Sequence, residues 1–206
     1  MIHYSEEDIE DLDKVFRINL INSCTGYKSA NLIGTKSDEG IPNVAIFSSI
    51  VHLGSNPPLL GFFLRPTEIF PRNTYTNIKE NGVYTINSIY KKIINDAHHT
   101  SAKYDKNISE FSVTNLKEEY IEDIYAPFVK NSPIKIEMKF LEEIRIKANK
   151  CKLIVGKIVS LHIENILLEK DGFLSLNKGG IPTISGCDGY YIPNDYIRKE
   201  YQKLNK

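Results

Sequence analysis

The sequence predicts a mainly β protein, a β-barrel with helical insertions, and three observations lead to this fold class. Residues 134–140 alternate apolar and polar side chains, as a half-buried strand does. Several other runs rich in β-branched and aromatic residues are separated by short turn signals, which favours antiparallel pairing. Two segments, after Arg72 and after Tyr90, change to helical spacing. Together these features are typical of a barrel with inserted helices.

The two ends of the chain differ from its body. Ser5 is followed by Glu6, Glu7 and Asp8, a pattern typical of a helix cap with acidic residues in the first turn. We expect residues 1–27 to form a short helical or irregular arm, and the polar residues 194–206 to form a C-terminal tail. No change of composition divides the body, so residues 1–206 are predicted to form a single domain.

The first half of the body predicts a hairpin followed by another strand. Residues 30–36 form a strand candidate, and the turn residues at 37–40 lead into a second strand over 43–51. The Asn-Pro-Pro run at 56–58 ends that second strand, and residues 59–64 begin the next one.

The second half begins with the change to helical spacing. Asn73 or Thr74 can cap a helix that Gly82 stops, and residues 83–87 return to a strand. Residues 90–102 have helical spacing, and the polar residues 103–117 form a long excursion. Three more strands follow, at 134–140, at 152–163 with a bend at Gly156, and at 190–192.

Composition excludes several classes of function. The 206 residues carry 26 Lys and Arg against 26 Asp and Glu, so the chain lacks the basic excess of a nucleic-acid-binding or polybasic membrane-binding surface. No apolar run approaches the roughly 20 residues of a membrane helix, and the acidic N-terminus does not resemble a signal peptide. Cys24, Cys151 and Cys187 fit neither a disulfide framework nor a zinc site. We therefore expect a cytoplasmic protein.

Two adjacent hydroxyls interrupt the apolar run at 43–51. Successive side chains of a strand point to opposite faces, so Ser48 and Ser49 cannot both face solvent. Buried polar groups require partners. The partner of each serine is therefore a question that the sequence raises.

A candidate anion site follows these serines along the chain. Arg65 precedes a proline, and Arg72 opens the helix predicted to start at Asn73 or Thr74. A helix N-terminus offers free backbone N–H groups and a positive dipole end. Ser48, Ser49 and Thr74 could add hydroxyl donors, with charge-assisted hydrogen bonds worth roughly 1.5–3 kcal/mol each. Each residue alone also has an ordinary interpretation, as a backbone-bonded serine, a solvated turn or a helix cap.

Seven stretches in fixed order resemble the flavin reductase-like family, which has the FMN-binding split barrel. They are NVAIFSSIV, NPPLLGFFLRP, PRNTYTNIKENGVYTIN and AHHTSAKY, followed by SPIKIEMKF, LIVGKIVSLH and SGCDGYY. The resemblance extends from about Lys28 to Pro193. It implies a split barrel of six antiparallel strands in Greek-key order, usually a homodimer with FMN at or near the subunit interface.

The resemblance also implies roles for individual residues. Phosphate or ribityl contacts would come from Ser48, Ser49, Arg65, Arg72, Asn73 and Thr74, and Ala45, Ile46 and Phe47 would line the ring. His99, Thr100 and Ser101 would line the nicotinamide or flavin pocket, with His99 as a proton donor to reduced flavin or, equally, a helix-capping residue. Many members of the family have proline where this chain has Ile46, and Lys-Asp where it has Arg72 and Asn73. Both departures leave the substrate open.

Other motifs favour no separate site. His98 and His99 point about 100° apart on a helix, so they cannot readily share a metal ion. The chain has no G-x-G-x-x-G after a strand, so NAD(P)H would bind chiefly by stacking on the flavin.

The sequence therefore predicts an FMN-dependent oxidoreductase that takes hydride from NAD(P)H onto a bound flavin. The alternatives are an FMN-binding electron carrier without efficient NAD(P)H turnover, and a split barrel that binds another ligand such as haem, or none. The final acceptor stays open among free flavin, a partner monooxygenase, ferric complexes and quinones, as does the choice of NADH or NADPH.

Overall fold

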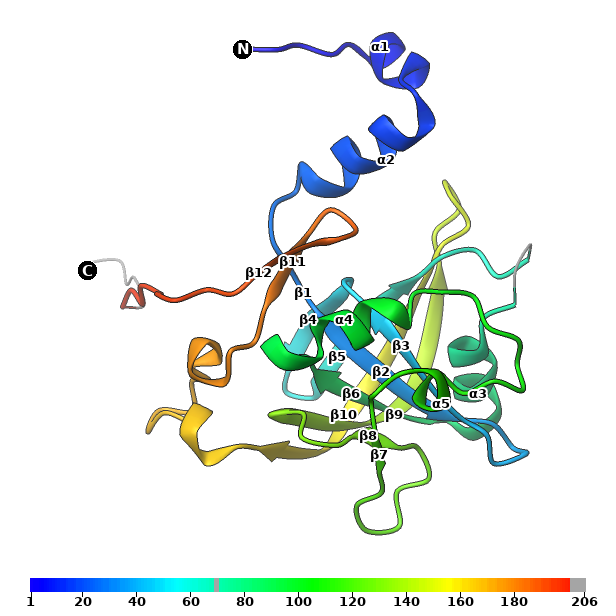
Figure 1. The fold of residues 1–206 in the computed structure, drawn as a ribbon, viewed down its shortest axis with the longest axis vertical. Helices are drawn as coiled ribbons and strands as arrows, with labels where there is room; N and C mark the ends of the chain where they lie inside the picture. The colour runs from blue at the N-terminus through cyan, green and yellow to red at the C-terminus, as the bar shows by residue number, and fades with distance from the viewer. Residues whose placement is uncertain (69–70, 201–206) are drawn as a thin grey trace.

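The structure is a computed structural model that describes residues 1–68 and 71–200. Its body is a seven-stranded antiparallel sheet with the strand order β3-β2-β6-β9-β10-β5-β4 (Figure 1). The strands are β2 (Asn31–Lys36), β3 (Pro42–Phe47), β4 (Ile50–Ser55), β5 (Pro58–Leu64), β6 (Val83–Ser88), β9 (Ile134–Arg145) and β10 (Lys152–Ile163). The predicted mainly β fold with helical insertions is confirmed.

The sheet curves back on itself through a two-residue connection. β3 and β4 lie at opposite ends of the strand order, yet only Ser48 and Ser49 join them in the chain. The step from Phe47 to Ile50 spans at most about 11 Å, so the two edges of the sheet must come together here. This connection gives the fold the character of a split barrel.

The single strand predicted over residues 43–51 is therefore wrong, because the run contributes two strands. Ser48 forms a bend, and Ser49 belongs to neither strand. The pairing accordingly contains seven strands where six were expected. The opposite-faces argument for the two serines does not hold, since neither residue lies within a strand.

Two smaller sheets extend the body. β1 (Lys28–Ser29), β11 (Thr183–Ser185) and β12 (Gly189–Tyr191) form a three-stranded sheet in the order β1-β11-β12, and β12 accounts for the strand predicted at 190–192. β7 (Glu118–Glu119) pairs with β8 (Phe128–Val129), and both strands follow the predicted excursion over residues 103–117.

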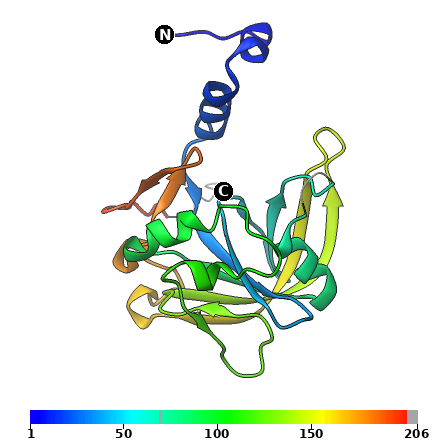
Figure 2. The same cartoon turned by 45° about the vertical axis from the view of Figure 1, so that its right-hand side comes forward.

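Five α-helices accompany the sheets in the described part of the chain. They are α1 (Glu6–Asp11), α2 (Lys14–Ser23), α3 (Asn73–Asn81), α4 (Ile94–His99) and α5 (Glu110–Val113), with 3₁₀ turns at Lys91–Ile93, Asn165–Leu167 and Leu176–Gly179. Ser5 caps α1 as predicted, through a capping box with Asp8. α1 and α2 bury no residue and project away from the barrel (Figure 2). The helix predicted over 90–102 is the shorter pair of the first 3₁₀ turn and α4.

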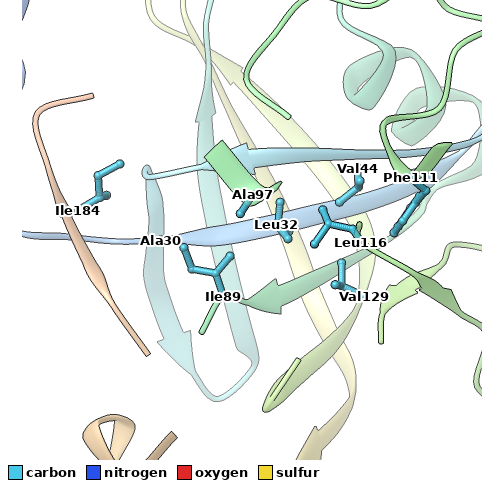
Figure 3. Close-up of a cluster of buried hydrophobic side chains, with 9 residues drawn as sticks. All are labelled: Ala30, Leu32, Val44, Ile89, Ala97, Phe111, Leu116, Val129 and Ile184. Carbon is cyan, nitrogen blue, oxygen red and sulfur yellow. The ribbon is translucent and has the colours of Figure 1, made fainter. Parts of the chain in front are cut away.

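Apolar side chains cover both faces of β2, the strand next to the edge strand β3. Leu32 and Ile33 are fully buried, and they point to opposite faces of the sheet. Leu32 belongs to a cluster that includes Ala97 of α4 and Phe111 of α5 (Figure 3). Ile33 belongs to the cluster inside the barrel, with Phe62 and Met138. The helices α4 and α5 are thereby held against the β2–β3 side of the sheet.

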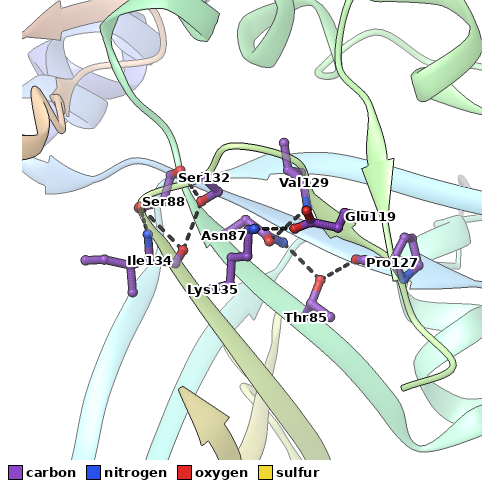
Figure 4. A network of polar contacts seen from close by, with 9 residues as sticks. All are labelled: Thr85, Asn87, Ser88, Glu119, Pro127, Val129, Ser132, Ile134 and Lys135. Atoms are coloured by element: carbon purple, nitrogen blue, oxygen red, sulfur yellow. Dashed lines mark hydrogen bonds and ion pairs between the residues drawn. The ribbon is translucent and has the colours of Figure 1, made fainter. Parts of the chain in front are cut away.

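A buried polar network fixes the loop before β9 to β6 (Figure 4). The Thr85 hydroxyl donates to the Pro127 carbonyl at 2.6 Å, and the Val129 N–H donates to Asn87 Oδ1 at 3.0 Å. Ser132 Oγ donates to the Ser88 carbonyl at 2.7 Å. These bonds give the buried hydroxyl and amide groups partners, as burial requires.

The bend predicted at Gly156 is confirmed by a shift in register between Val155 and Gly156 in the β9–β10 pairing. A side chain at Gly156 would overlap the hydroxyl group of Tyr84, which occupies that space inside the barrel. Glycine is therefore required by close approach at this position.

Candidate functional site

A cavity of about 1360 Å³ lies at the β3–β4 connection, the N-terminus of α3 and the loop after α4. Its lining contains eleven residues that the sequence analysis named: Ala45, Ile46, Phe47, Ser48, Ser49, Arg65, Arg72, Asn73, Thr74, Thr100 and Ser101. These residues come from four segments that are separated in the sequence. The fold thus brings the proposed ligand contacts to one cavity.

His99 is not among the residues that line this cavity. The side chain is exposed at the end of α4, and its Nε2 lies 2.6 Å from the hydroxyl oxygen of Tyr104. Tyr104 itself lines the cavity. The imidazole therefore reaches the cavity only through the tyrosine hydroxyl, a contact that the sequence did not predict.

The N-terminus of α3 faces the cavity with unsatisfied donors. Arg72, rather than Asn73 or Thr74, is the N-cap residue, with an extended backbone and no side-chain hydrogen bond to the helix. The first backbone N–H groups of α3 consequently lack partners within the helix. The first turn contains no acidic residue, so the positive end of the helix dipole is uncompensated.

Two arginines add positive charge to the same cavity. Arg65 follows β5 directly and is exposed, and Arg72 is half-buried at the start of α3. Neither side chain belongs to an ion pair within the described residues. An anionic ligand at the start of α3 would supply the missing negative charge.

Thr74 is held in place by a buried amide. Asn43 Nδ2 donates to Thr74 Oγ1 and to Thr35 Oγ1, each at 3.2 Å. Asn77 Nδ2 also donates to Thr35 Oγ1, at 3.0 Å. Because Thr74 Oγ1 accepts the bond from Asn43, its own proton stays available for a ligand.

The structure separates the roles of the two serines. Ser49 Oγ donates to the carbonyl of Phe63 at 3.0 Å and accepts from the N–H of Phe63 at 3.2 Å. This is the ordinary, backbone-bonded interpretation of a serine. The Ser48 side chain is half-buried in the cavity lining and forms no hydrogen bond within residues 1–68 and 71–200. Ser48 is therefore the better candidate for a ligand contact.

Glu110 is a cavity residue that the sequence analysis did not identify. Its side chain belongs to α5, only 5% of the residue is exposed, and Oε2 accepts a hydrogen bond from the Val44 N–H at 3.1 Å. Burial raises the pKa of this carboxyl group above its ordinary value. The sequence gives little indication of this role, because Glu110 is one acidic residue within a polar segment. The adjacent apolar residue Phe111 is the one local signal that this turn is buried.

The bond to Glu110 also reveals the free edge of β3. In the sheet containing it, β3 pairs only with β2, and Val44 lies opposite Gly34. Since the Val44 N–H points to Glu110, the backbone N–H and C=O groups of Val44 and Ile46 face away from β2. Ile46 thus offers a donor and an acceptor at the edge of the strand. A proline at this position would remove only the outward-facing N–H.

The described residues contain neither a metal cluster nor a membrane-spanning helix. No group of three or more His, Cys, Asp or Glu side chains in residues 1–68 and 71–200 could hold a metal ion. Within the same ranges, no helix has the length and apolar character needed to cross a bilayer.

The fold and cavity define a split-barrel protein with an anion-favouring helix start beside a free strand edge. The model of the Flavin reductase like domain matches residues 27–185. The chain therefore belongs to the flavin reductase-like family, as its sequence motifs predict.

Known proteins agree with this assignment. A Shewanella frigidimarina protein assigned as a flavin reductase with a split barrel domain is 42% identical, with a TM-score of 0.94 and coverage of 98% of this chain and 100% of that one. The uncharacterized protein YwrF of Bacillus subtilis is 27% identical over 64% of this chain and 66% of its own length, so the match spans about two thirds of YwrF.

More distant structures share the fold. The nitrilotriacetate monooxygenase component B of Bacillus cereus has a TM-score of 0.83 at 19% identity, over 97% of this chain and 98% of that one. Flavoredoxin of Desulfovibrio vulgaris has a TM-score of 0.74 at 23% identity, over 85% and 91% of the two chains.

Proposed function

We propose that the protein is an FMN-dependent oxidoreductase that takes hydride from NAD(P)H and passes electrons to an acceptor. The observation that carries this proposal is the convergence of three features on one cavity. They are two arginines that form no ion pair with any described residue, the uncapped start of α3 and the free edge of β3. A ligand with a dianionic end and a flat heterocyclic end matches this arrangement. Family membership supports the same ligand class.

The residues present fit FMN at both ends. Arg65, Arg72 and the first N–H groups of α3 would hold the phosphate, with Ser48 and Thr74 donating from their hydroxyls. The backbone of Ile46 would pair with donors and acceptors on the ring edge. When bound, FMN would supply the hydride-accepting chemistry, and the chain would supply binding, orientation and exclusion of water.

The cavity has room for a second molecule. Its volume of about 1360 Å³ exceeds the roughly 300–1,000 Å³ of an ordinary ligand pocket. We assign this extra space to the nicotinamide of NAD(P)H, beside Thr100 and Ser101. Proton donation by His99 would in this arrangement pass through the hydroxyl of Tyr104, because that hydroxyl separates the imidazole from the cavity.

Assembly completes the proposal. We propose a homodimer with the flavin near the subunit interface, supported by the projecting arm, which buries nothing in its own chain yet leads directly into cavity residues such as Tyr27. A partner oxygenase is one acceptor that the proposal allows.

Titration with FMN and with riboflavin tests the binding proposal. We expect Arg72→Ala to weaken FMN binding about 10- to 100-fold, as the loss of a charge-assisted bond does, and to leave riboflavin binding within about two-fold. Arg198→Ala is the control, since Arg198 pairs with Asp171 outside the cavity lining. Equal losses for FMN and riboflavin would contradict a phosphate role for Arg72.

The same purified protein tests the reaction. Flavin absorption should bleach when NADH or NADPH is added without oxygen. If flavin binds but is not reduced by either nucleotide, the protein is an FMN-binding electron carrier and not a reductase. If the protein binds no flavin, the whole proposal is refuted.

A further inference from the structure

A second cavity, of about 410 Å³, lies on the far side of the α3 N-terminus. One face of α3 forms one wall, through Asn73, Thr76, Asn77 and Glu80, which are spaced as neighbours on a helix. The turn between β2 and β3 forms the opposite wall, with Asp38 and Glu39 among its residues. The volume is sufficient for a single nucleoside.

The two cavities border each other at the proposed phosphate site. Asn43, Pro71, Asn73 and Lys106 line both of them. Asn73 is the first residue of α3, where the phosphate of FMN would be bound. A group that extends from that phosphate past the first turn of the helix would therefore enter the second cavity.

The charged residues of this cavity favour hydroxyl groups over further phosphates. Asp38, Glu39 and Glu80 line it, and none of the three belongs to an ion pair within the described residues. Carboxylates accept hydrogen bonds from the hydroxyls of an unmodified ribose and repel a ribose phosphate. Lys106 lies where the two cavities meet, where it could offset the charge of a pyrophosphate.

The remaining lining suits a purine base. Ile41, Pro42 and Ile108 supply apolar surface. Only 5% of Asn77 is exposed, and its Nδ2 already donates a hydrogen bond to Thr35 Oγ1. Its side-chain oxygen has no donor within the described residues, so an exocyclic amino group could supply one.

We propose that the second cavity binds the adenosine end of a pyrophosphate-linked dinucleotide whose ribose hydroxyls are unmodified. This inference rests on the proposed function, because it takes the start of α3 as the phosphate site. Two ligands carry this chemistry: FAD, placed in the flavin site in place of FMN, and NADH, placed as the reductant. A 2′-phosphate, as in NADPH, would meet the three carboxylates.

Thr76→Trp tests the proposal by filling the cavity from the exposed side of α3. Flavin binding is measured by fluorescence titration with FMN and with FAD, and NADH and NADPH binding to the FMN-loaded protein by calorimetry. We expect the variant to bind FAD or NADH at least about 10-fold more weakly than the wild type, with FMN affinity within about two-fold. Loss for FAD identifies the flavin as the source of the adenosine, and loss for NADH identifies the reductant.

Glu80→Arg provides a second test that does not depend on steric filling. Replacing a carboxylate with a cation should raise the affinity for NADPH relative to NADH about 10-fold if the reductant occupies the cavity, and should change the affinity ratio of FAD to FMN if the flavin does. Glu164→Arg is the control, at an exposed glutamate outside both cavities. If FMN binds normally but neither variant alters FAD or NADH binding, the adenosine site is overturned while the proposed function stands. If the wild type binds no flavin, both proposals fail.

Discussion

The carboxylate of Glu110 accepts a hydrogen bond from the backbone N–H of Val44 at 3.1 Å, at the free edge of β3. This bond joins α5 to a strand whose neighbouring residues line the large cavity. It replaces the pairing that a further strand would provide at this edge. The position of the cavity wall therefore depends on a buried acidic side chain.

We predict that Glu110→Ala destabilises the protein by about 1–3 kcal/mol, because the Val44 N–H would lose its partner in a buried place. Glu110→Gln should cost less, since the amide oxygen can still accept this bond. Urea unfolding of both variants measures the difference. Equal costs for the two variants would show that the bond to Val44 contributes little.

The pH dependence of stability gives an independent test of Glu110. Burial raises the pKa of its carboxyl group, so the folded chain holds this proton more tightly than the unfolded chain. Its contribution to stability is complete below the unfolded pKa of about 4.3 and is lost as the pH rises through the folded value. The free energy of unfolding of the wild type relative to Glu110→Gln should therefore fall as the pH rises above about 4. A constant difference, or one that rises with pH, would contradict the buried carboxyl.

The two serines between β3 and β4 should respond in opposite ways to substitution. Ser49→Ala removes both bonds to the Phe63 backbone and should cost roughly 1–2 kcal/mol of stability. Ser48→Ala removes no hydrogen bond to a described residue and should change stability by less than about 0.5 kcal/mol, while weakening FMN binding. Thermal unfolding and flavin titration of the two single variants separate these effects. A loss of flavin affinity confined to Ser49→Ala would reverse the assignment.

Local sequence signals predicted most of the elements. The capping box at Ser5, the left-handed Gly82 that ends α3 and the alternation in β9 depend on residues close in sequence, and each is present. The break at Ser48 and Ser49 was not predicted, because apolar residues flank it on both sides. The strand breaks where the chain passes from one edge of the sheet to the other, and there Ser49 bonds to Phe63 of β5.

The candidate site likewise contains residues that the sequence motifs predicted and residues whose roles depend on the folded chain. The motifs named eleven residues that line the cavity, because their order along the chain resembles that of the family. Glu110 could not be found in this way, since its role depends on which N–H groups of β3 remain outside the sheet. Tyr104 is the last residue of the AHHTSAKY motif, but no role was predicted for it, because its contact with His99 depends on how the chain turns beyond α4.

Tyr84 should tolerate, or benefit from, loss of its hydroxyl group. The hydroxyl is buried without a hydrogen-bond partner in the described residues, and burial raises its pKa. We predict that Tyr84→Phe leaves the free energy of unfolding unchanged or raises it by about 1 kcal/mol. Gly156→Ala should cost about 1–3 kcal/mol through overlap with that hydroxyl, and less in the Tyr84→Phe background. A double-mutant cycle by urea unfolding measures this coupling, and additive effects would rule the overlap out.

The last prediction concerns α2, whose apolar side chains lie all round the helix. Val15, Phe16, Ile18 and Ile21 are between 42% and 64% exposed, and α2 buries no residue in its own chain. Exposed apolar side chains gathered on one element usually mark an interaction surface, so we propose that a second copy of the chain covers α2. Val15→Glu combined with Ile18→Glu should shift the protein towards the monomer in sedimentation experiments.

The same double variant should unfold as the wild-type monomer does, because neither side chain packs in its own barrel. FMN affinity should fall with dissociation if the interface borders the cavity, since Asn22 and Tyr27 of the arm line the cavity. Lys14→Glu is the matched control, as it changes the charge of α2 without removing an apolar side chain. A wild-type protein that sediments as a monomer and still retains FMN would show that the arm needs no second copy.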